Sequence, residues 1–204
     1  MRTPKPSRAP RRRKPNTLVP VAAAFAGFVL AAAAALWWLS PLPSAEAPIG
    51  GPFRLIAGDG RVVTDRDFRG KYLLVYFGYT ICPDICPTTL QSVAAALDRL
   101  GAKADRLQPL LITVDPTRDT PPVLAQYAAA FSPRLIGLSG TPEQIAAVER
   151  EYRIYAAIRP AGGGYAVDHS SALFLMGPDG RFIARLDPEA SASEIAADLG
   201  RSVS

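Results

Sequence analysis

This 204-residue chain is poor in the residues that bind soft metals. It contains two cysteines, two methionines and one histidine. The cysteines are Cys82 and Cys86, and the histidine is His169. A structural zinc site normally needs four protein ligands, and too few of the right kind are present unless a carboxylate such as Asp168 joins them. If the protein binds a thiophilic metal or carries out thiol chemistry, the residues responsible are therefore these three.

Positive charge is also lacking outside the first residues. The formal net charge is +5, but seven cations precede residue 15: Arg2, Lys5, Arg8, Arg11, Arg12, Arg13 and Lys14. From Ile49 onward there are 16 Lys and Arg against 17 Asp and Glu, which is a net charge of −1. Because the basic character belongs to the N-terminal tail, no nucleic-acid partner is expected for the rest of the chain.

Residues 18–39 contain no charged side chain and include the pair Trp37-Trp38. An apolar run of ~20 residues can cross a bilayer as a helix, and tryptophans favour the membrane interface. By the positive-inside rule, the basic tail lies in the cytoplasm. A cleaved signal peptide is the alternative, because Ala45-Glu46-Ala47 has the form of a cleavage site, but signal h-regions span only ~7–15 residues.

The sequence thus predicts four parts: a basic cytoplasmic tail (1–17), a transmembrane anchor (18–39), a Pro-rich linker (40–51) and a folded domain (52–204). Hydrophobic patterning in the folded part predicts a hairpin (53–56 and 61–63), strands (71–77, 108–114 and 135–138), helices (87–100, 121–131 and one from Thr141), a second hairpin (172–176 and 181–186) and a closing helix (191–200). Such βαβ units followed by a hairpin and a helix predict an α/β, thioredoxin-like fold with an extra N-terminal β-hairpin.

The cysteines follow a predicted buried strand and stand at the start of the next helix. A helix N-terminus carries partial positive charge, which stabilises a thiolate, so we expect a lowered cysteine pKa. Cys82 and Cys86 are four residues apart, which places both sulfurs on one face if the turn is helical. Disulfide exchangers typically use a C-x-x-C pair. The wider spacing leaves room for an ion between the sulfurs.

His169 is the third candidate ligand, 83 residues beyond Cys86 and just before a predicted strand. A lone histidine at a strand entrance is commonly structural, but a thioredoxin-like layout places the loop before this hairpin beside the redox helix. Two thiolates and one imidazole suit Cu(I) or Cu(II) better than magnesium or calcium. The three residues are therefore a candidate site for a soft ion such as copper.

Three alternatives remain open for the cysteines. In the first alternative they form a disulfide. A purely structural one would close a short loop and add little stability, and a reversible one would form in the metal-free protein. In the second alternative Cys82 and Cys86 cycle as the redox-active pair of a thiol-disulfide oxidoreductase. The third alternative, a thiol peroxidase, fits poorly, since the Pro-x-x-x-Thr-x-x-Cys pattern requires Thr where Tyr79 and Pro83 stand.

Four segments resemble the Sco/SenC family of copper chaperones for cytochrome c oxidase: Tyr76 to Pro87, Val114 to Pro121, Val167 to Ser170, and Gly177 to Gly180. The resemblance implies a thioredoxin-like domain that binds one copper ion through Cys82, Cys86 and His169. It implies a role in assembling the CuA centre of oxidase subunit II, or in keeping the cysteines of that centre reduced. Enzymatic turnover is not required for the first role.

The resemblance also frames the surroundings of the site. Asp168 is expected to orient the imidazole by accepting its second N–H, whereas Asp115 and Asp119 are expected only to shape an Asp-Pro turn and a helix start. Partners would be oxidase subunit II and other periplasmic copper chaperones. A bacterial protein would be held in the inner membrane with its domain in the periplasm, and a eukaryotic one in the mitochondrial inner membrane.

Overall fold

The computed structural model describes residues 28, 30–35, 37–38 and 48–203. The chain divides into two compact units between Glu46 and Ala47. Within the described ranges, no helix is long and apolar enough to cross a membrane. The predicted tail (1–17) lies outside the described residues, as do much of the predicted anchor and most of the predicted linker. The described positions between 28 and 38 are helical.

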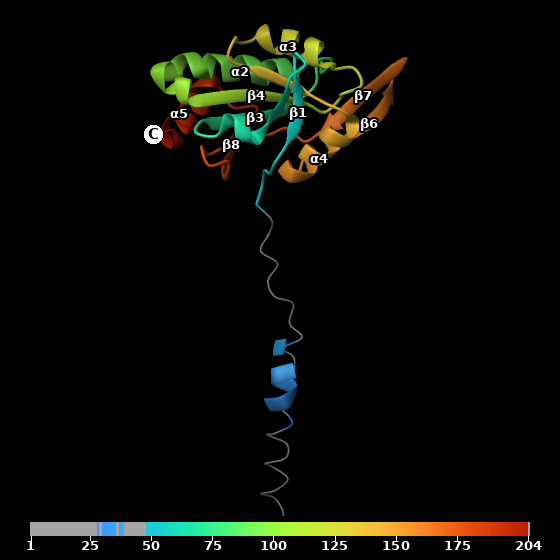
Figure 1. Ribbon diagram of the computed structural model, residues 1–204, viewed down its shortest axis with the longest axis vertical. Coiled ribbons are helices and arrows are strands. Elements are labelled where there is room, and N and C mark those ends of the chain that lie inside the picture. The colour runs from blue at the N-terminus through green and yellow to red at the C-terminus, as the bar shows by residue number, and fades with distance from the viewer. Residues whose placement is uncertain (1–27, 29, 36, 39–47, 204) are drawn as a thin grey trace, which may run out of the picture. The chain divides into compact units, whose positions relative to one another are not determined.

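The second unit is built on a seven-stranded mixed sheet with the order β2-β1-β5-β4-β3-β8-β9, and a separate two-stranded sheet pairs β6 with β7 (Figure 1). The strands are β1 (Arg54–Ala57), β2 (Val62–Thr64), β3 (Tyr72–Gly78), β4 (Leu107–Thr113), β5 (Ile136–Ser139), β6 (Ala156–Ala161), β7 (Gly164–His169), β8 (Leu173–Met176) and β9 (Phe182–Leu186). The helices are η1 (Asp65–Phe68), α2 (Ile85–Leu100), η2 (Gly101–Arg106), α3 (Pro121–Ala129), α4 (Pro142–Tyr152) and α5 (Ala192–Ser202).

Strand β3 is an interior strand of this sheet, as expected because all seven of its residues are apolar or small, and all are buried. It pairs in parallel with β4 and antiparallel with β8. The connections from β3 through α2 to β4, and from β4 through α3 to β5, step across the sheet in the same direction. Since such crossovers are right-handed, α2 and α3 cover the same face, and Figure 1 shows α4 on the other side.

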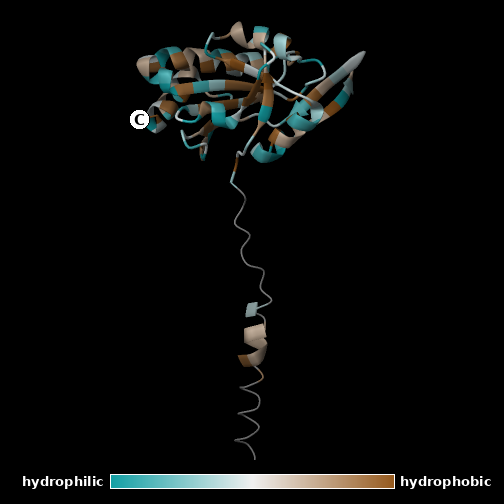
Figure 2. Cartoon of the chain, viewed as in Figure 1, coloured by the Kyte–Doolittle hydropathy of each residue, from teal (hydrophilic) through white to brown (hydrophobic). Residues whose placement is uncertain are grey.

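The side chains of β3 alternate between two layers of core. Phe77 contacts Tyr152 of α4 and Phe174 of β8, with ring centroids 5.3 Å and 6.2 Å away. Tyr76 and Gly78 face α2, where α5 packs beside it. Hydrophobic residues accordingly concentrate along the central strands and α2 (Figure 2). These layers confirm the predicted α/β thioredoxin-like arrangement, including the N-terminal hairpin of β1 and β2.

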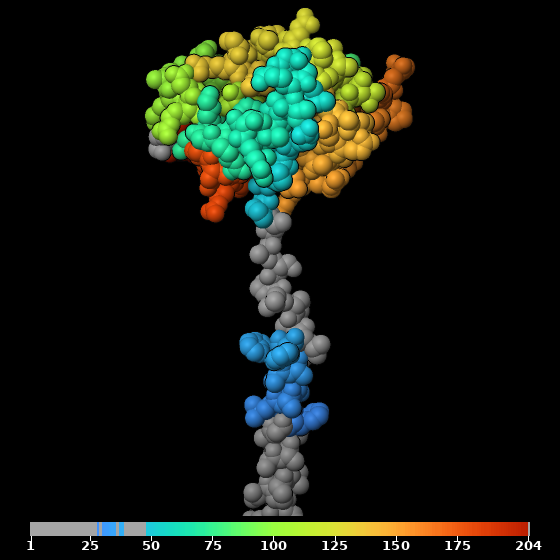
Figure 3. Space-filling view, in the orientation of Figure 1, coloured from blue at the N-terminus to red at the C-terminus, as the bar shows by residue number. Residues whose placement is uncertain are grey.

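The predicted elements do not include the hairpin of β6 and β7. Its turn falls on three consecutive glycines, residues 162–164, and glycine is depleted in strands. Gly162 and Gly163 form its turn with positive φ angles of 33° and 91°. The β6–β7 hairpin projects from one end of the domain (Figure 1). In the space-filling view, β1, β2 and η1 form the cyan front surface beside the orange α4 (Figure 3). The hairpin matters for function because His169 is its last residue.

Candidate metal centre

The cysteine pair lies where β3 gives way to α2. Cys82 is in the connecting loop and half-buried, and its amide donates to the Tyr79 carbonyl oxygen at 3.3 Å. Helix α2 begins at Ile85, two residues earlier than predicted, so Cys86 lies in its first turn and is fully buried. Pro87 is accommodated there because first-turn amides need no intrahelical partner.

Gly78 provides the space that the inner cysteine occupies. A Cβ at this position would lie 3.0 Å from the Cys86 sulfur and 3.1 Å from Cε1 of Tyr76. Both distances are shorter than ordinary van der Waals contact. The glycine is therefore required by the close approach of Cys86 to the end of β3, rather than by a special backbone angle.

The fold brings His169 to the two cysteines. Nε2 of His169 lies 3.8 Å from Sγ of Cys86, and one ligand atom from each of the three residues lies within 4.8 Å of the others. Cys82 and His169 line a hollow of about 540 Å³, together with Tyr79, Ile85 and Tyr155 among others. Because Cys86 does not line this hollow, its sulfur is the inner member of the set.

The orientation of the imidazole is set by the backbone. Nδ1 of His169 lies 3.0 Å from the carbonyl oxygen of Ser170. Since a carbonyl can only accept, Nδ1 carries the ring proton and Nε2 presents its lone pair toward Cys86. Burial lowers the pKa of His169, against opposing effects of the Ser170 hydrogen bond and the Asp168 charge. The neutral imidazole that ligation requires is thus favoured.

The hydrogen bond that we expected from His169 to Asp168 is made instead to Ser170. The carboxylate of Asp168 pairs with Nε of Arg159 at 2.6 Å, and both side chains are substantially exposed. The reason is the strand geometry, since neighbouring residues of β7 point to opposite faces. Asp168 influences the imidazole through its charge alone.

The expected lowering of the cysteine pKa is not found for Cys86. Burial raises the pKa of its thiol, and the neighbouring Cys82 thiol adds to the increase. Desolvation of the charged sulfur therefore outweighs the partial charge of the helix N-terminus at this depth. Both cysteines are free thiols in the structure. The reversible disulfide of the metal-free protein stays a prediction.

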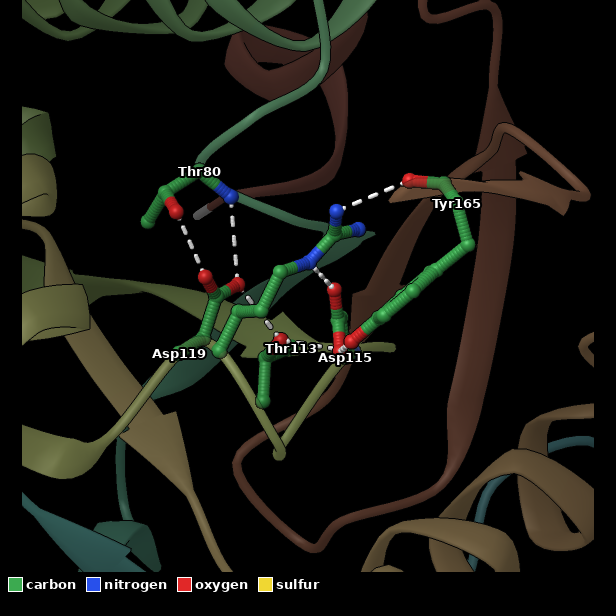
Figure 4. Close-up of polar contacts among 6 residues, drawn as sticks. Thr80, Thr113, Asp115, Asp119 and Tyr165 are labelled. Carbon is green, nitrogen blue, oxygen red and sulfur yellow. Dashed lines mark hydrogen bonds and ion pairs between the residues drawn. The ribbon is translucent and has the colours of Figure 1, made fainter. Parts of the chain in front are cut away.

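Asp119 holds the cysteine loop, although the sequence indicated only a turn and a helix start at this position. Asp119 is fully buried and accepts hydrogen bonds from the Thr80 amide at 3.1 Å and hydroxyl at 2.5 Å. It also accepts from the Thr113 hydroxyl at 2.7 Å (Figure 4). Thr80 is two residues before Cys82, so Asp119 fixes the chain that leads into the site. Only its depth of burial distinguishes it from an ordinary turn residue, and the sequence does not show that depth.

The donor set fits a soft ion. Metal–sulfur bonds of about 2.3 Å and metal–nitrogen bonds of about 2.0 Å, as known for zinc sites, separate two ligands of one ion by at most about 4.6 Å. The Cys86–His169 distance lies within this limit, and all three ligand atoms lie within 4.8 Å of one another. Two thiolates and one imidazole suit copper well. Among the described residues, no other group of three or more metal-ligating side chains is drawn together in this way.

Comparison with known proteins identifies the family. A sequence profile described as SCO1/SenC matches residues 42–204. The chain belongs to the SCO1/SenC family. Protein SenC of Rhodobacter capsulatus is 47% identical over 158 residues, which cover 77% of this chain and 72% of SenC. Protein SCO1 homolog 1 of Arabidopsis thaliana, a mitochondrial protein, is 45% identical over 144 residues, covering 69% of this chain and 43% of that relative.

The fold is also that of solved SCO1/SenC structures. The structure of Bradyrhizobium japonicum ScoI with copper bound matches with a TM-score of 0.70 and 45% identity, covering 75% of this chain and 98% of ScoI. This chain spans less than half the length of the Arabidopsis relative. The comparison therefore concerns the domain shared by the SCO1/SenC family.

Proposed function

We propose that this SCO1/SenC protein binds one copper ion through Cys82, Cys86 and His169 and acts as a copper chaperone in the assembly of cytochrome c oxidase. The observation that supports the site most directly is the convergence of the three ligand atoms to within 4.8 Å, although His169 is 83 residues from Cys86. Copper would be cargo here, so a three-ligand set open to a hollow is suitable for its release to a partner.

Each ligand contributes differently to such a site. Cys86 is buried and supplies an anchoring sulfur, whereas Cys82 and His169 line the hollow. A ligand from an acceptor protein would therefore approach the side of Cys82 and His169. Exposed apolar side chains flank this side, with Ile81 59%, Ile85 44% and Tyr155 61% exposed. We propose that the acceptor is the CuA site of oxidase subunit II and that other periplasmic copper chaperones serve as donors.

A thiol-disulfide oxidoreductase is the second candidate, and the two free thiols favour it. A half-buried Cys82 ahead of a buried Cys86 is the arrangement of an accessible thiol with a resolving partner. In this role the chain would keep the cysteines of the CuA site, or of another extracytoplasmic target, reduced. His169 would then be auxiliary.

The variant His169→Ala separates the two functions. The chaperone proposal requires that copper affinity and the Cu(II) spectrum change in this variant, while reduction of a disulfide substrate by the dithiol continues. Unchanged copper stoichiometry, affinity and spectrum would leave the oxidoreductase as the better description.

For the location, we propose a membrane anchor at residues 18–39 with the copper-binding domain (52–204) in the periplasm. The support is the length of the uncharged run and the basic tail before it. Protease protection of the full chain in sealed inner-membrane vesicles tests this topology. A domain degraded from the cytoplasmic side, or released without detergent, would contradict it.

A further inference from the structure

The two segments that carry the candidate ligands are both held by the short connection between β4 and α3. The cysteine loop is fixed at Thr80 through Asp119. One residue before Asp119, Arg118 reaches in the other direction, to the hairpin that carries His169. Its Nη1 donates to the carbonyl oxygen of Tyr165 at 2.8 Å. The side chain is only 23% exposed.

Arg118 and Asp115 both bind Tyr165 of the hairpin. Nε of Arg118 pairs with the buried Asp115 carboxylate, which also accepts a hydrogen bond from the Tyr165 hydroxyl at 2.9 Å (Figure 4). The guanidinium carbon lies 3.8 Å from the centroid of the Tyr165 ring, a close cation–π contact. Tyr165 is thus held at its ring, its hydroxyl and its backbone carbonyl.

The contacts of Arg118 and Asp115 with Tyr165 lie on the same face of the hairpin as His169. Tyr165, Val167 and His169 alternate along β7, so their side chains point to the same face. Val167 is buried. The strands β6 and β7 pair only with each other and leave most of β6 exposed. Contacts from this face to the rest of the domain therefore decide where the imidazole lies.

A second contact continues the chain of interactions to the imidazole. The Arg118 guanidinium lies 5.8 Å from the Tyr79 ring centroid. The Tyr79 ring in turn meets the His169 ring edge-on, with centroids 5.8 Å apart. Tyr79 also accepts the hydrogen bond from the Cys82 amide through its carbonyl oxygen. Arg118 consequently lies between the two ligand-bearing segments.

We propose that Arg118 is a positioning residue for the copper site, which holds the β6–β7 hairpin against the cysteine loop so that His169 reaches the ion. The inference rests on the proposed function and extends it. Arg118 does not touch the ligand atoms. Its hydrogen bond and its closest ring contact are with Tyr165 of the hairpin, whereas the Tyr79 ring is 5.8 Å away. We therefore expect its effect to pass mainly through the position of His169, while the cysteine loop stays held at Thr80 through Asp119.

Arg118→Lys is the informative variant because it keeps a positive charge beside the buried Asp115. A lysine cannot pair with Asp115, donate to Tyr165 and lie flat on its ring at once. In the full chain in detergent, we expect Cu(II) affinity to fall about tenfold or more, as for groups that orient a metal ligand. The Cu(II) spectrum should shift toward that of His169→Ala. Arg134→Lys, at the exposed pair with Asp105, is the matched control.

A double variant distinguishes positioning from general destabilisation. If Arg118 acts through His169, adding Arg118→Lys to His169→Ala should change Cu(II) affinity less than about twofold, because the interaction is already lost. Independent losses that multiply would overturn the proposal. So would a single Arg118→Lys variant with the affinity and spectrum of the unaltered protein.

Hydrogen exchange of the metal-free, reduced chain provides a readout without copper. Amides of β6 and β7 should exchange faster in Arg118→Lys, while those of β3 and β4 stay protected. Unchanged exchange in the hairpin would contradict the proposal. If the unaltered protein bound no copper, the proposed function would fail, while this measurement would still decide whether Arg118 holds the hairpin.

Discussion

Nε2 of His169 lies 3.8 Å from Sγ of Cys86, although 83 residues separate them in the chain. Two different elements create this proximity: the first turn of α2 places the sulfur, and the last residue of the β6–β7 hairpin places the imidazole. Neither element contains a complete site. The account therefore makes predictions about each ligand and about the residues that support it.

Removal of the imidazole should weaken Cu(II) binding more than Cu(I) binding. In His169→Ala we expect a loss of Cu(II) affinity beyond the roughly 10–100-fold seen when supporting groups around metal ligands are removed. Two thiolates remain, and thiolates suit Cu(I). Competition titrations with chelators for each oxidation state measure the difference. Ser170→Ala is the matched control, because it keeps the carbonyl that orients His169 and removes only the hydroxyl that accepts from the Tyr155 amide at 3.3 Å.

Gly78→Ala should push Cys86 out of position. The new methyl group would stand 3.0 Å from the Cys86 sulfur, and overpacking of this kind costs about 1–3 kcal/mol in free energy of unfolding. Copper affinity should fall as well. Gly200→Ala is the control, since its Cβ would make an ordinary 3.7 Å contact with Leu100, and alanine favours a helix. Urea unfolding of both variants measures the difference. A Gly78→Ala protein with an unchanged free energy of unfolding and unchanged copper affinity would refute the close-packing argument.

Asp119→Ala should destabilise the domain and loosen the cysteine loop. Its carboxylate serves the amide and hydroxyl of Thr80 and the hydroxyl of Thr113. Leaving buried donors without a partner costs about 1–3 kcal/mol each, so we expect a loss of about 2–4 kcal/mol after partial rehydration. Denaturant midpoints measure it. Asp105→Ala, at an exposed pair with Arg134, should lose less than about 1 kcal/mol.

Glu149 on α4 should make stability depend on pH. Burial raises the pKa of Glu149 to about 7, from 4.5 in the unfolded chain. Between these values the folded chain binds more protons than the unfolded one, so the free energy of unfolding falls as pH rises from about 4.5 through 7. Because the side chain is only half-buried, solvent screening limits the loss to about 1 kcal/mol.

The variant Glu149→Gln should remove this pH dependence. Unfolding of the reduced, metal-free chain at pH 5 and pH 8 provides the comparison. Glu143→Gln, at an exposed position of the same helix whose carboxyl pKa is lowered, should leave the slope between these values unchanged. An equal slope in the unaltered chain and in Glu149→Gln would contradict the assignment.

The sequence could identify the candidate ligands because the chain has few alternatives. Cys82 and Cys86 follow an apolar run that is unmistakably a buried strand, and His169 is the single histidine. The support around them could not be identified in the same way. Asp119 stands in a segment typical of an Asp-Pro turn, and only the folded chain shows that its carboxylate is buried beneath Thr80.

The missed β6–β7 hairpin, the wrong hydrogen-bond partner of His169 and the wrong direction of the Cys86 pKa shift share a physical cause, since each depends on tertiary structure. The strand β6 reads Ala-Ala-Ile-Arg-Pro-Ala, without apolar alternation, and its turn is rich in glycine. Because the sequence patterns did not predict this hairpin, they could not predict that Asp168 and His169 point to opposite faces of β7. Likewise, the pKa of Cys86 depends on its depth, which the position at a helix start does not reveal. Local patterns predicted most of the elements, whereas the β6–β7 hairpin and the burial of Asp119 and Cys86 required the tertiary fold.

Anaerobic copper titration of the reduced full chain in detergent, followed by absorption and EPR spectroscopy after oxidation to Cu(II), tests the central claim most directly. We predict one copper ion per chain and thiolate-to-Cu(II) charge-transfer absorption, with binding abolished in Cys82→Ser and altered in His169→Ala. Binding no tighter than that of an unstructured peptide with two thiols, or a Cu(II) spectrum indifferent to His169→Ala, would contradict a copper site formed by Cys82, Cys86 and His169.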